Sequence, residues 1–411
     1  MRHFLLAILL LAFTFIQAQS VKKLHSKAVL VDTHNDVLSS AVLDGIDISN
    51  RVKQGHSDLV RWKEGRVDVQ FFSVWTDKKA RTKEGFFHDA VAEIDSLNRL
   101  LLRNPHRMIP ATHYKEVKKG IRQQKLVSLI GVEGGHMIED KISNLEELAR
   151  LGMRYMTLTW NNSTSWATSA MDENSPSFGG GRGEVNSKGG GRGEAGGGEK
   201  KRGLSEFGKQ VVKRMNELGV MVDLSHTGEK TFYDAIAASS KPVLVSHSSV
   251  WNLCPVFRNV KDDQIKAVAK NGGVICINFY SGFISRKWDE TQKELNDPNA
   301  KTKFSEQGNY QADTVARDKE WRKYRNERLD AVRPTLADLV NHIDYIVKLV
   351  GDDYVGIGSD YDGVGSVPIG MEDVTTYPKI TEELKRRGYS DKSVKKILGK
   401  NVLRVMKANF N

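Results

Sequence analysis

Short apolar runs rich in β-branched residues recur along this chain, and segments with helical periodicity separate them. We count eight such runs, at residues 28–32, 69–75, 126–132, 155–159, 220–224, 242–246, 274–279 and 355–358. The helix-like stretches between them include residues 85–103, 143–151, 205–217, 262–271 and 335–350. This alternation is typical of a parallel βα protein, whose strands are buried on both faces. Eight units in series predict an α/β fold, a (β/α)8 TIM-type barrel, with a doubly wound open sheet as the alternative.

Side chains that ligate metals follow five of the eight runs. They are His34 and Asp36 after the first run, Glu133 after the third, His226 after the fifth, His247 after the sixth and Asp360 after the eighth. Alternate residues of a strand project to the same face, so the first two project together. In a (β/α)8 barrel all these strand ends meet on one rim, whereas an open sheet offers no reason for so many ligand types.

The set predicts a site for two divalent metal ions with a carboxylate bridging them. Singly, each member has a simpler explanation: Glu133 could cap a helix, Asp360 could form a turn, and either later histidine could pack in the core. A binuclear site deprotonates a bridging water near neutral pH and polarises a carbonyl beside it. Hydrolysis of an amide or ester is therefore the expected chemistry.

Two further residues are candidates for roles in such a reaction. We expect Asp360 to carry the proton from the water to the leaving amine, because it closes the barrel opposite His34 and need not be a ligand. Arg258 follows His247 on the expected sixth loop, and its planar guanidinium suits a substrate carboxylate. A surface salt bridge explains the position of Arg258 equally well.

The first twenty residues have the layout of a secretory signal peptide. A basic start at Arg2 and His3 precedes an apolar run over residues 4–16 and a small residue, Ala18. We predict a signal peptide at residues 1–18 and a single barrel domain at residues 19–411, in a protein exported to the periplasm or secreted. An uncleaved amphipathic anchor is the alternative, and we expect no membrane span in the mature chain.

The charge pattern bears on the class of partner, and the cysteine content bears on the class of scaffold. The net charge of +11 raises the question of nucleic acid. Basic and acidic residues are interspersed, as over residues 317–325, and no aromatic-basic motif accompanies them, so we expect a solvated basic surface and no nucleic-acid partner. The two cysteines, Cys254 and Cys276, exclude a disulfide-rich scaffold. Cys276 lies in an apolar run, where a buried free thiol is expected.

Two insertions interrupt the βα pattern. Residues 173–202 contain an imperfect Gly-Gly-Gly-Arg-Gly-Glu repeat, which predicts a low-complexity surface loop rather than a phosphate-binding loop, since no strand leads directly into it. Residues 281–333 are charged and partly helical, and they follow the expected seventh strand. We expect this second insertion to act as a lid or a subunit contact.

Around the candidate metal ligands the sequence resembles the renal or membrane dipeptidase family of binuclear zinc peptidases, peptidase family M19. The similarity runs from Asp32 to Arg404. Its most specific segments are Gly131-Val-Glu-Gly-Gly-His136, Gly152-Met-Arg-Tyr-Met-Thr-Leu-Thr159, Asp223-Leu-Ser-His226, Val245-Ser-His-Ser-Ser249 and Gly358-Ser-Asp-Tyr-Asp-Gly363.

The resemblance implies a (β/α)8 barrel, often a homodimer, that hydrolyses dipeptides at two zinc ions. Carried onto matching positions, it implies one zinc site made by His34, Asp36 and Glu133 and another made by Glu133, His226 and His247. Glu133 then bridges the two ions. The resemblance also implies that Arg258 grips the carboxylate of the dipeptide and that Asp360 is the acid–base residue.

One position departs from the family pattern. Where the family usually presents a histidine that contacts substrate, this chain has Trp160, followed by Asn161 and Asn162. An indole donates one hydrogen bond but cannot become cationic, so we expect an altered substrate preference, with either asparagine as a substitute donor. The alternatives are a related hydrolase of another small amide or lactone, in which Trp160 stacks on a ring, and a non-catalytic binding protein that retains the metals.

Overall fold

The computed structural model describes residues 19–174, 203–307 and 314–410. The predicted signal peptide and nearly all of the glycine-rich insertion lie outside the described residues. The strands of the described chain are β1 (Val31–Asp32), β2 (Val69–Trp75), β3 (Met108–Pro110), β4 (Leu126–Glu133), β5 (Met153–Thr157), β6 (Met221–Asp223), β7 (Leu244–Ser248), β8 (Val274–Ile277) and β9 (Val355–Ile357). All their pairings are parallel.

Eight of these strands close into a barrel. The hydrogen-bonded order runs β2-β1-β9-β8-β7-β6-β5-β4, and β2 pairs with β4 along its whole length, from Val69 with Val127 to Trp75 with Glu133. One edge of β4 is occupied by β2. The other edge is shared by β3 and by β5, which pairs from Ile130 onward. The short strand β3 therefore lies outside the closed ring, and the predicted (β/α)8 barrel is confirmed.

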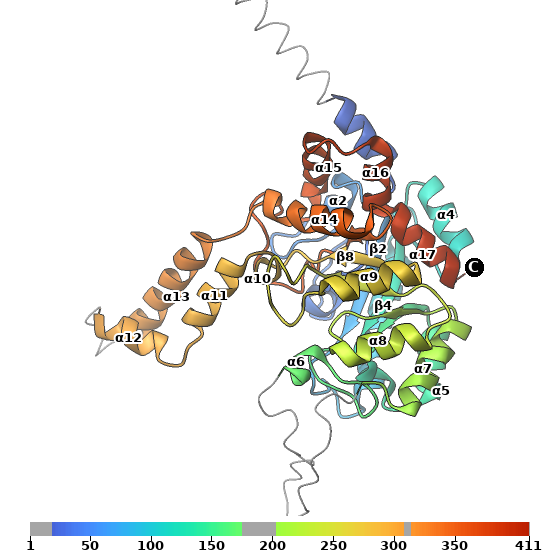
Figure 1. Cartoon of the computed structure of the whole chain (residues 1–411), viewed down its shortest axis with the longest axis horizontal. Coiled ribbons are helices and arrows are strands. Elements are labelled where there is room, and N and C mark those ends of the chain that lie inside the picture. Colours follow the sequence, from blue (N-terminus) through green and yellow to red (C-terminus); the bar gives the residue numbers. More distant parts are fainter. Residues whose placement is uncertain (1–18, 175–202, 308–313, 411) are drawn as a thin grey trace, which may run out of the picture.

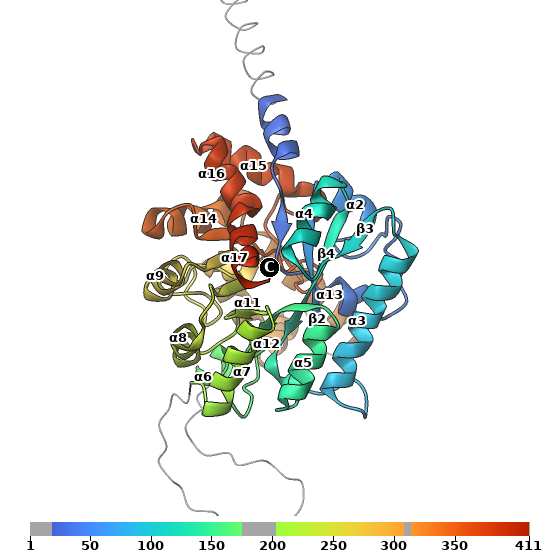
Figure 2. The ribbon, with the colours of Figure 1, turned by 90° about the vertical axis from the view of Figure 1, so that its right-hand side faces the viewer.

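Helices surround the strands as a ring (Figure 2). They are α2 (Leu59–Glu64), α3 (Phe86–Arg103), α4 (Tyr114–Arg122), α5 (Ile142–Arg150), α6 (Ala170–Glu173), α7 (Glu206–Glu217), α8 (Glu229–Ala238), α9 (Asp262–Asn271), α14 (Leu336–Val350), α15 (Tyr377–Arg386) and α16 (Asp391–Lys395), whereas α17 (Asn401–Asn409) lies nearer the centre of this view. Local capping defines several starts: Thr335 and Asp338 form a capping box at α14. The Ser205 hydroxyl likewise accepts the Gly208 N–H at α7.

Alternation along β4 explains how the barrel is filled and where its site lies. Val127 and Leu129 belong to an apolar cluster that also contains Val402 and Met406 of α17, so this helix packs against the amino ends of the strands. Glu133 has the same alternation phase as those two inward residues. The strand therefore delivers apolar side chains to the barrel interior and then a carboxylate at its carboxyl end.

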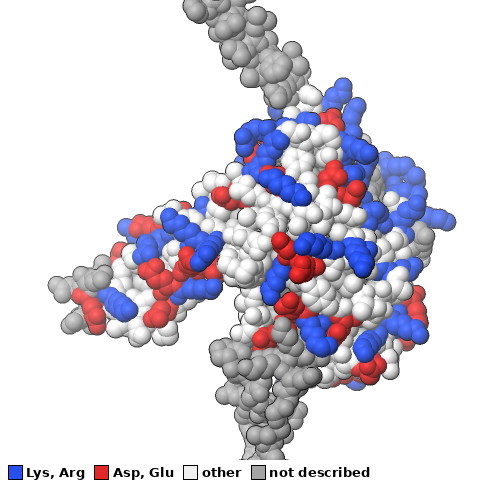
Figure 3. Space-filling model, viewed as in Figure 1, with Lys and Arg blue, Asp and Glu red and all other residues white. Residues whose placement is uncertain are grey.

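The second insertion forms a helical arm. After β8 the chain continues into α10 (Ser281–Ile284), α11 (Arg286–Leu295), α12 (Ala300–Gln307) and α13 (Thr314–Asp330). The last three extend away from the barrel (Figure 1), and basic and acidic side chains are interspersed over them (Figure 3). The prediction of a charged, partly helical insertion after the seventh barrel strand is confirmed.

Several boundaries differ from the predicted runs. The run at 242–246 becomes β7 at Leu244–Ser248, so His247 lies within the strand rather than after it. The three residues of β3 were not predicted, because the stretch is short and ends in Pro110. Cys254 and Cys276 are buried free thiols. Among the described helices, none has the length and apolar character needed to cross a bilayer.

Candidate metal centre

Gly131, which precedes Glu133 on β4, makes room for a tyrosine ring that contacts His34. A side chain at Gly131, two residues earlier on β4, would collide with the Tyr155 ring of the paired strand β5. The glycine lets that ring lie across the barrel, where the Tyr155 hydroxyl is 2.7 Å from Nδ1 of His34. A small residue on one strand thus determines how a histidine on another strand is held.

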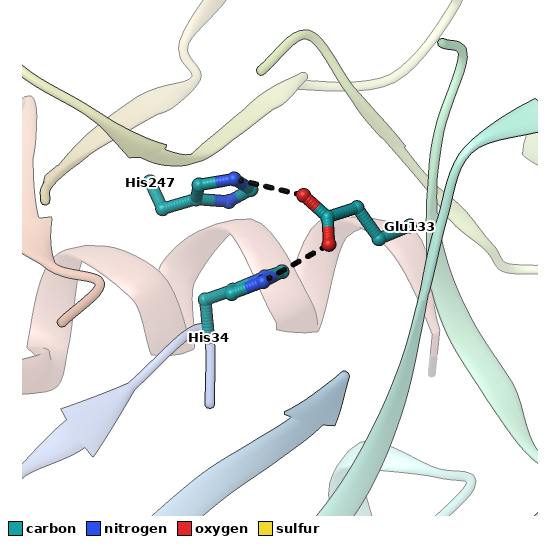
Figure 4. A group of neighbouring side chains, drawn as sticks. All are labelled: His34, Glu133 and His247. Atoms are coloured by element: carbon teal, nitrogen blue, oxygen red, sulfur yellow. Dashed lines mark ion pairs between the residues drawn. The ribbon is translucent and has the colours of Figure 1, made fainter. Parts of the chain in front are cut away.

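The Glu133 carboxylate lies between histidines from three different strand ends. Its Oε2 is 3.5 Å from Nε2 of His34, and its Oε1 is 2.7 Å from Nε2 of His226 and 3.2 Å from Nε2 of His247. Figure 4 shows the carboxylate with one oxygen directed to His34 and the other to His247. All four side chains are buried. One carboxylate oxygen thus faces His34, and the other faces both His226 and His247.

Two further carboxylates stand beside His34. Nε2 of His34 is 3.4 Å from Oδ2 of Asp36 and 4.0 Å from Oδ1 of Asp360. The expectation that Asp360 lies opposite His34 is wrong: β9 pairs with β1, so the loop after β9 places Asp360 next to His34. Gly363 permits this crowding, since a Cβ there would collide with Asp36 and lie 2.6 Å from Oδ1 of Asp360.

Each histidine is held through its outer ring nitrogen by a different neighbour. Nδ1 of His34 contacts the Tyr155 hydroxyl at 2.7 Å, as described above. Nδ1 of His226 is 3.0 Å from the side-chain oxygen of Asn161, and Nδ1 of His247 is 2.7 Å from the Ser246 hydroxyl. These contacts leave all three Nε2 atoms directed at the carboxylates. Outer contacts of this kind orient the histidines of metal sites.

Unsatisfied atoms test whether this donor set suits a metal. Nε2 of His34 and Oδ1 of Asp36 are buried and have no hydrogen-bond partner among the described residues. Nε2 of His226 and Nε2 of His247 lie 3.0 Å apart and face the same carboxylate oxygen. Buried polar atoms rarely remain unpaired. Imidazole and carboxylate donors arranged in this way fit divalent ions such as zinc.

The pKa values of three of the donors agree with that fit. Burial and the nearby Arg258 cation lower the pKa of His226 to about 4, and burial together with His34 lowers the pKa of His247. Although burial opposes its charge, Glu133 has a pKa well below its ordinary value because His34, His226 and His247 surround it. His226 and His247 are therefore neutral and Glu133 is ionised, the protonation states that ligate metals. His34 differs: although burial opposes its charge, Tyr155, Asp36 and Glu133 raise its pKa well above the ordinary value, so a metal ion must displace its proton.

Asp360 is placed differently from the other carboxylates. Its Oδ2 accepts a 2.7 Å hydrogen bond from the side-chain amide of Asn278, and its backbone has a left-handed φ of 61°. Burial, together with the negative charges of Asp36 and Glu133, raises its pKa well above the ordinary value despite the opposing effect of His34. A raised pKa suits a carboxyl group that must both accept and release a proton near neutral pH.

Arg258 is buried without an acidic partner among the described residues. Its guanidinium donates to the His247 carbonyl at 3.2 Å and to the Ser248 hydroxyl at 3.4 Å, and it lies 5.3 Å from the centre of the Phe283 ring. Burial lowers its pKa to about 10, so it remains cationic at neutral pH. A surface salt bridge, the alternative for this residue, is excluded because only 5% of Arg258 is exposed.

A cavity of about 710 Å³ opens beside these residues. Glu133, His226, Arg258 and Asp360 line it, as do Trp75, Trp160 and Asn161. The Trp75 and Trp160 rings meet edge to face, with their centres 5.2 Å apart, and form an aromatic wall. Asn162 does not line this cavity.

Sequence reasoning missed the residues that hold the donors in place. Tyr155 and Ser246 lie within predicted strands, and Asn278 lies inside the apolar run at 274–279. A polar residue within an apolar run is the signal that could have drawn attention to each. The carboxylate of Asp223, at the end of β6, accepts hydrogen bonds from Thr157, Ser225 and Ser246.

Comparisons with known proteins agree with this geometry. A family model described as membrane dipeptidase, peptidase family M19, matches residues 18–410. The structure resembles that of the probable dipeptidase PvdM from Pseudomonas aeruginosa, with 24% identity, a TM-score of 0.76, and coverage of 95% of this chain and 97% of that one.

A second similar structure is a metallopeptidase from Rhodobacter sphaeroides, solved with a phosphinate mimic of the dipeptide L-Ala-D-Ala. It has 21% identity to this chain, a TM-score of 0.70, and coverage of 93% of this chain and 99% of that one. At these levels of identity the two structures show a shared fold over nearly the whole chain.

Proposed function

The chain belongs to the membrane dipeptidase family of metallopeptidases, peptidase family M19, and from this premise we propose that it is an exported dipeptidase that uses two zinc ions. In this proposal His34, Asp36 and Glu133 hold one ion, and Glu133, His226 and His247 hold the other. The observation that carries it is the Glu133 carboxylate, which directs one oxygen to His34 and the other to His226 and His247. A carboxylate between two donor groups is the arrangement that a bridging ligand requires.

When bound, the two ions polarise the amide carbonyl and lower the pKa of the attacking water. Asp360 takes the proton from that water and delivers it to the leaving amine, because it lies at the cavity wall beside His34. Asn278 orients the Asp360 carboxyl through the 2.7 Å hydrogen bond to Oδ2, so Oδ1 is the oxygen that faces His34.

Arg258 binds the carboxylate of the dipeptide in this proposal. Its charge is buried, has no acidic partner among the described residues, and lines the same cavity as Asp360. A substrate carboxylate would supply the missing negative charge, and such charge-assisted contacts are stronger than neutral ones. The Pseudomonas and Rhodobacter neighbours, a probable dipeptidase and a metallopeptidase solved with a dipeptide mimic, support small dipeptides as the first substrates to test.

The test measures free amino acids released from L-Ala-D-Ala, L-Ala-L-Ala and a mixed dipeptide library. Chelator-treated protein should show no release, and two equivalents of zinc should restore it. Release that survives complete removal of metal would contradict the proposal. So would the absence of any release from protein shown to hold two zinc ions.

The aromatic wall supports a second candidate substrate class. Trp75 and Trp160 present apolar surface to the cavity, next to the proposed metal ligand His226, whose ring centre lies 6.3 Å from that of Trp160. A ring-bearing amide or lactone would stack on this wall. A panel of cyclic amides and lactones, assayed beside the dipeptides at fixed zinc, distinguishes the two classes by their kcat/KM values.

Export and homodimer formation complete the proposal. Export depends on the signal-peptide pattern of residues 1–18. Amino-terminal sequencing of the mature protein from the extracytoplasmic fraction should give a start at Gln19. Analytical ultracentrifugation should give twice the mass of the mature chain, as the family resemblance implies.

A further inference from the structure

A second hollow adjoins the candidate active site, at the base of the helical arm. It has a volume of about 560 Å³, and its lining includes Trp288, Arg322 and Arg325. Tyr280 and Gln292 line both this hollow and the catalytic cavity, and the Tyr280 hydroxyl donates a 2.9 Å hydrogen bond to Gln292. The arm therefore contributes to the surroundings of the site and is not merely an appendage.

The two arginines of this hollow differ from the other arginines of α11 and α13. Arg286, Arg317 and Arg328 lie 2.7, 3.7 and 3.0 Å from carboxylate oxygens. Within the described chain Arg322 and Arg325 have no such partner. Arg322 donates to the Asp318 carbonyl of its own helix, and Arg325 donates to the neutral amide oxygen of Asn296.

The lining of the hollow also includes a buried indole and a carboxylate. Trp288 is only 2% exposed, and its indole N–H has no hydrogen-bond partner among the described residues. The nitrogen itself is inaccessible, so Trp288 contributes its ring surface to the lining of the hollow. Asp330 also lines the hollow, so the two arginines leave its lining with one excess positive charge.

We propose that this hollow is a subsite for an anionic group of the substrate, a carboxylate remote from the amide that is cleaved. Arg322 and Arg325 lie three residues apart on α13 and therefore project from the same side of the helix. Their guanidinium groups are cationic hydrogen-bond donors, and a carboxylate is an acceptor for both. The inference rests on the proposed dipeptidase function and refines it: substrates with an acidic side chain are preferred.

The test compares matched acidic and neutral dipeptides, Ala-Glu with Ala-Gln and Glu-Ala with Gln-Ala. We expect the acidic member of one pair to have at least a fivefold higher kcat/KM. That ratio should fall toward one in the R322Q/R325Q double variant and should shrink as salt is raised, because partly exposed charges are screened. The K319Q/K323Q variant removes the same charge from exposed positions of α13 outside both hollows and should keep the ratio.

A binding measurement separates failure of the subsite from failure of the dipeptidase function. Calorimetric titration of the zinc-loaded D360N protein with the same four dipeptides needs no turnover. Tighter binding of one acidic dipeptide, lost in the added R322Q/R325Q background, supports the subsite even if no dipeptide is hydrolysed. Equal binding and equal kcat/KM within both pairs, or a preference that persists without the two arginines, would overturn it.

Discussion

The Ser246 hydroxyl lies 2.7 Å from Nδ1 of His247. The same hydroxyl donates a 2.6 Å hydrogen bond to Oδ2 of Asp223, so it accepts the Nδ1 proton of His247 and leaves Nε2 unprotonated. The Asp223 carboxylate thus determines, through the Ser246 hydroxyl, which nitrogen of His247 carries the proton. This chain of contacts prepares His247 to bind a cation through Nε2, the atom that faces Glu133.

Replacing Ser246 with alanine should weaken zinc binding by about 10- to 100-fold, because the proton on His247 is then no longer directed to Nδ1. Competition with a fluorescent zinc chelator measures the change. Ser249→Ala removes another buried hydroxyl, whose 3.3 Å contact to the Asn278 carbonyl is outside the donor set. Equal zinc affinity in Ser246→Ala and Ser249→Ala would show that the serine does not position the histidine.

Replacing Arg258 with lysine should raise KM for dipeptides about tenfold and change kcat little, because lysine cannot reproduce the planar two-point contact with a carboxylate. A dipeptide amide, which lacks the terminal carboxylate, provides the control. The wild-type enzyme should discriminate strongly against the amide, and the variant should discriminate less. A fall in kcat with unchanged KM would instead assign Arg258 to the transition state.

Replacing Trp160 with histidine should raise kcat for L-Ala-L-Ala by about 10²-fold, because an imidazole restores a cationic donor to the cavity wall. Trp160→Phe removes the indole N–H without adding a charge and should show no such gain. Steady-state kinetics on both variants decide the question. Similar rates for the histidine and phenylalanine variants would show that the donor is immaterial and that the bulk of Trp160 controls access.

The free energy of unfolding should decrease as pH is lowered, because of His342, a histidine that lies apart from the metal donors. Buried His342 accepts the Val250 N–H at Nδ1, and its Nε2 is 3.1 Å from the Ile284 carbonyl. Burial lowers its pKa to about 4. The unfolded chain, with a histidine pKa near 6.5, therefore binds the proton first as pH falls from about 6.5 toward 4, and stability is lost over that range.

Between pH 7 and pH 5 this histidine should account for about 2 kcal/mol of lost unfolding free energy. Urea unfolding of the metal-free protein at both pH values measures the loss in wild type and in His342→Gln. The glutamine variant should lose about 2 kcal/mol less over the same interval. An identical loss in both proteins would mean that the pKa of His342 is the same in the folded and unfolded states, which contradicts the prediction.

The sequence predicted the barrel and its strand-end donors for the same physical reason. Apolar runs mark buried parallel strands, and closure brings the polar residues after them to one rim, so His34 and Glu133 could be expected together. The short strand β3 carried too little pattern to be recognised. Closure of eight strands in chain order pairs β9 with β1, so the place of Asp360 beside His34 followed from the predicted barrel, and the expectation of an opposite position overlooked it.

The contacts that hold the donors were beyond sequence reasoning. Tyr155 reaches His34 only because Gly131 leaves space for its ring, a relationship among three strands. The second hollow likewise depends on how α11 and α13 lie beside Tyr280 at the base of the arm, which residue composition does not specify. Spatial neighbours in a closed barrel are far apart in the chain, so their side-chain contacts follow from packing rather than from local pattern.

In the proposed mechanism the zinc-loaded chain hydrolyses dipeptides with Asp360 as the proton carrier. The most direct test measures amino-acid release by wild type and Asp360→Asn, with the zinc content of both determined on the same samples. We expect two zinc ions in each protein and a rate at least 10²-fold lower in the variant. Undiminished release by Asp360→Asn, or no release by a wild-type protein that holds both ions, would contradict it.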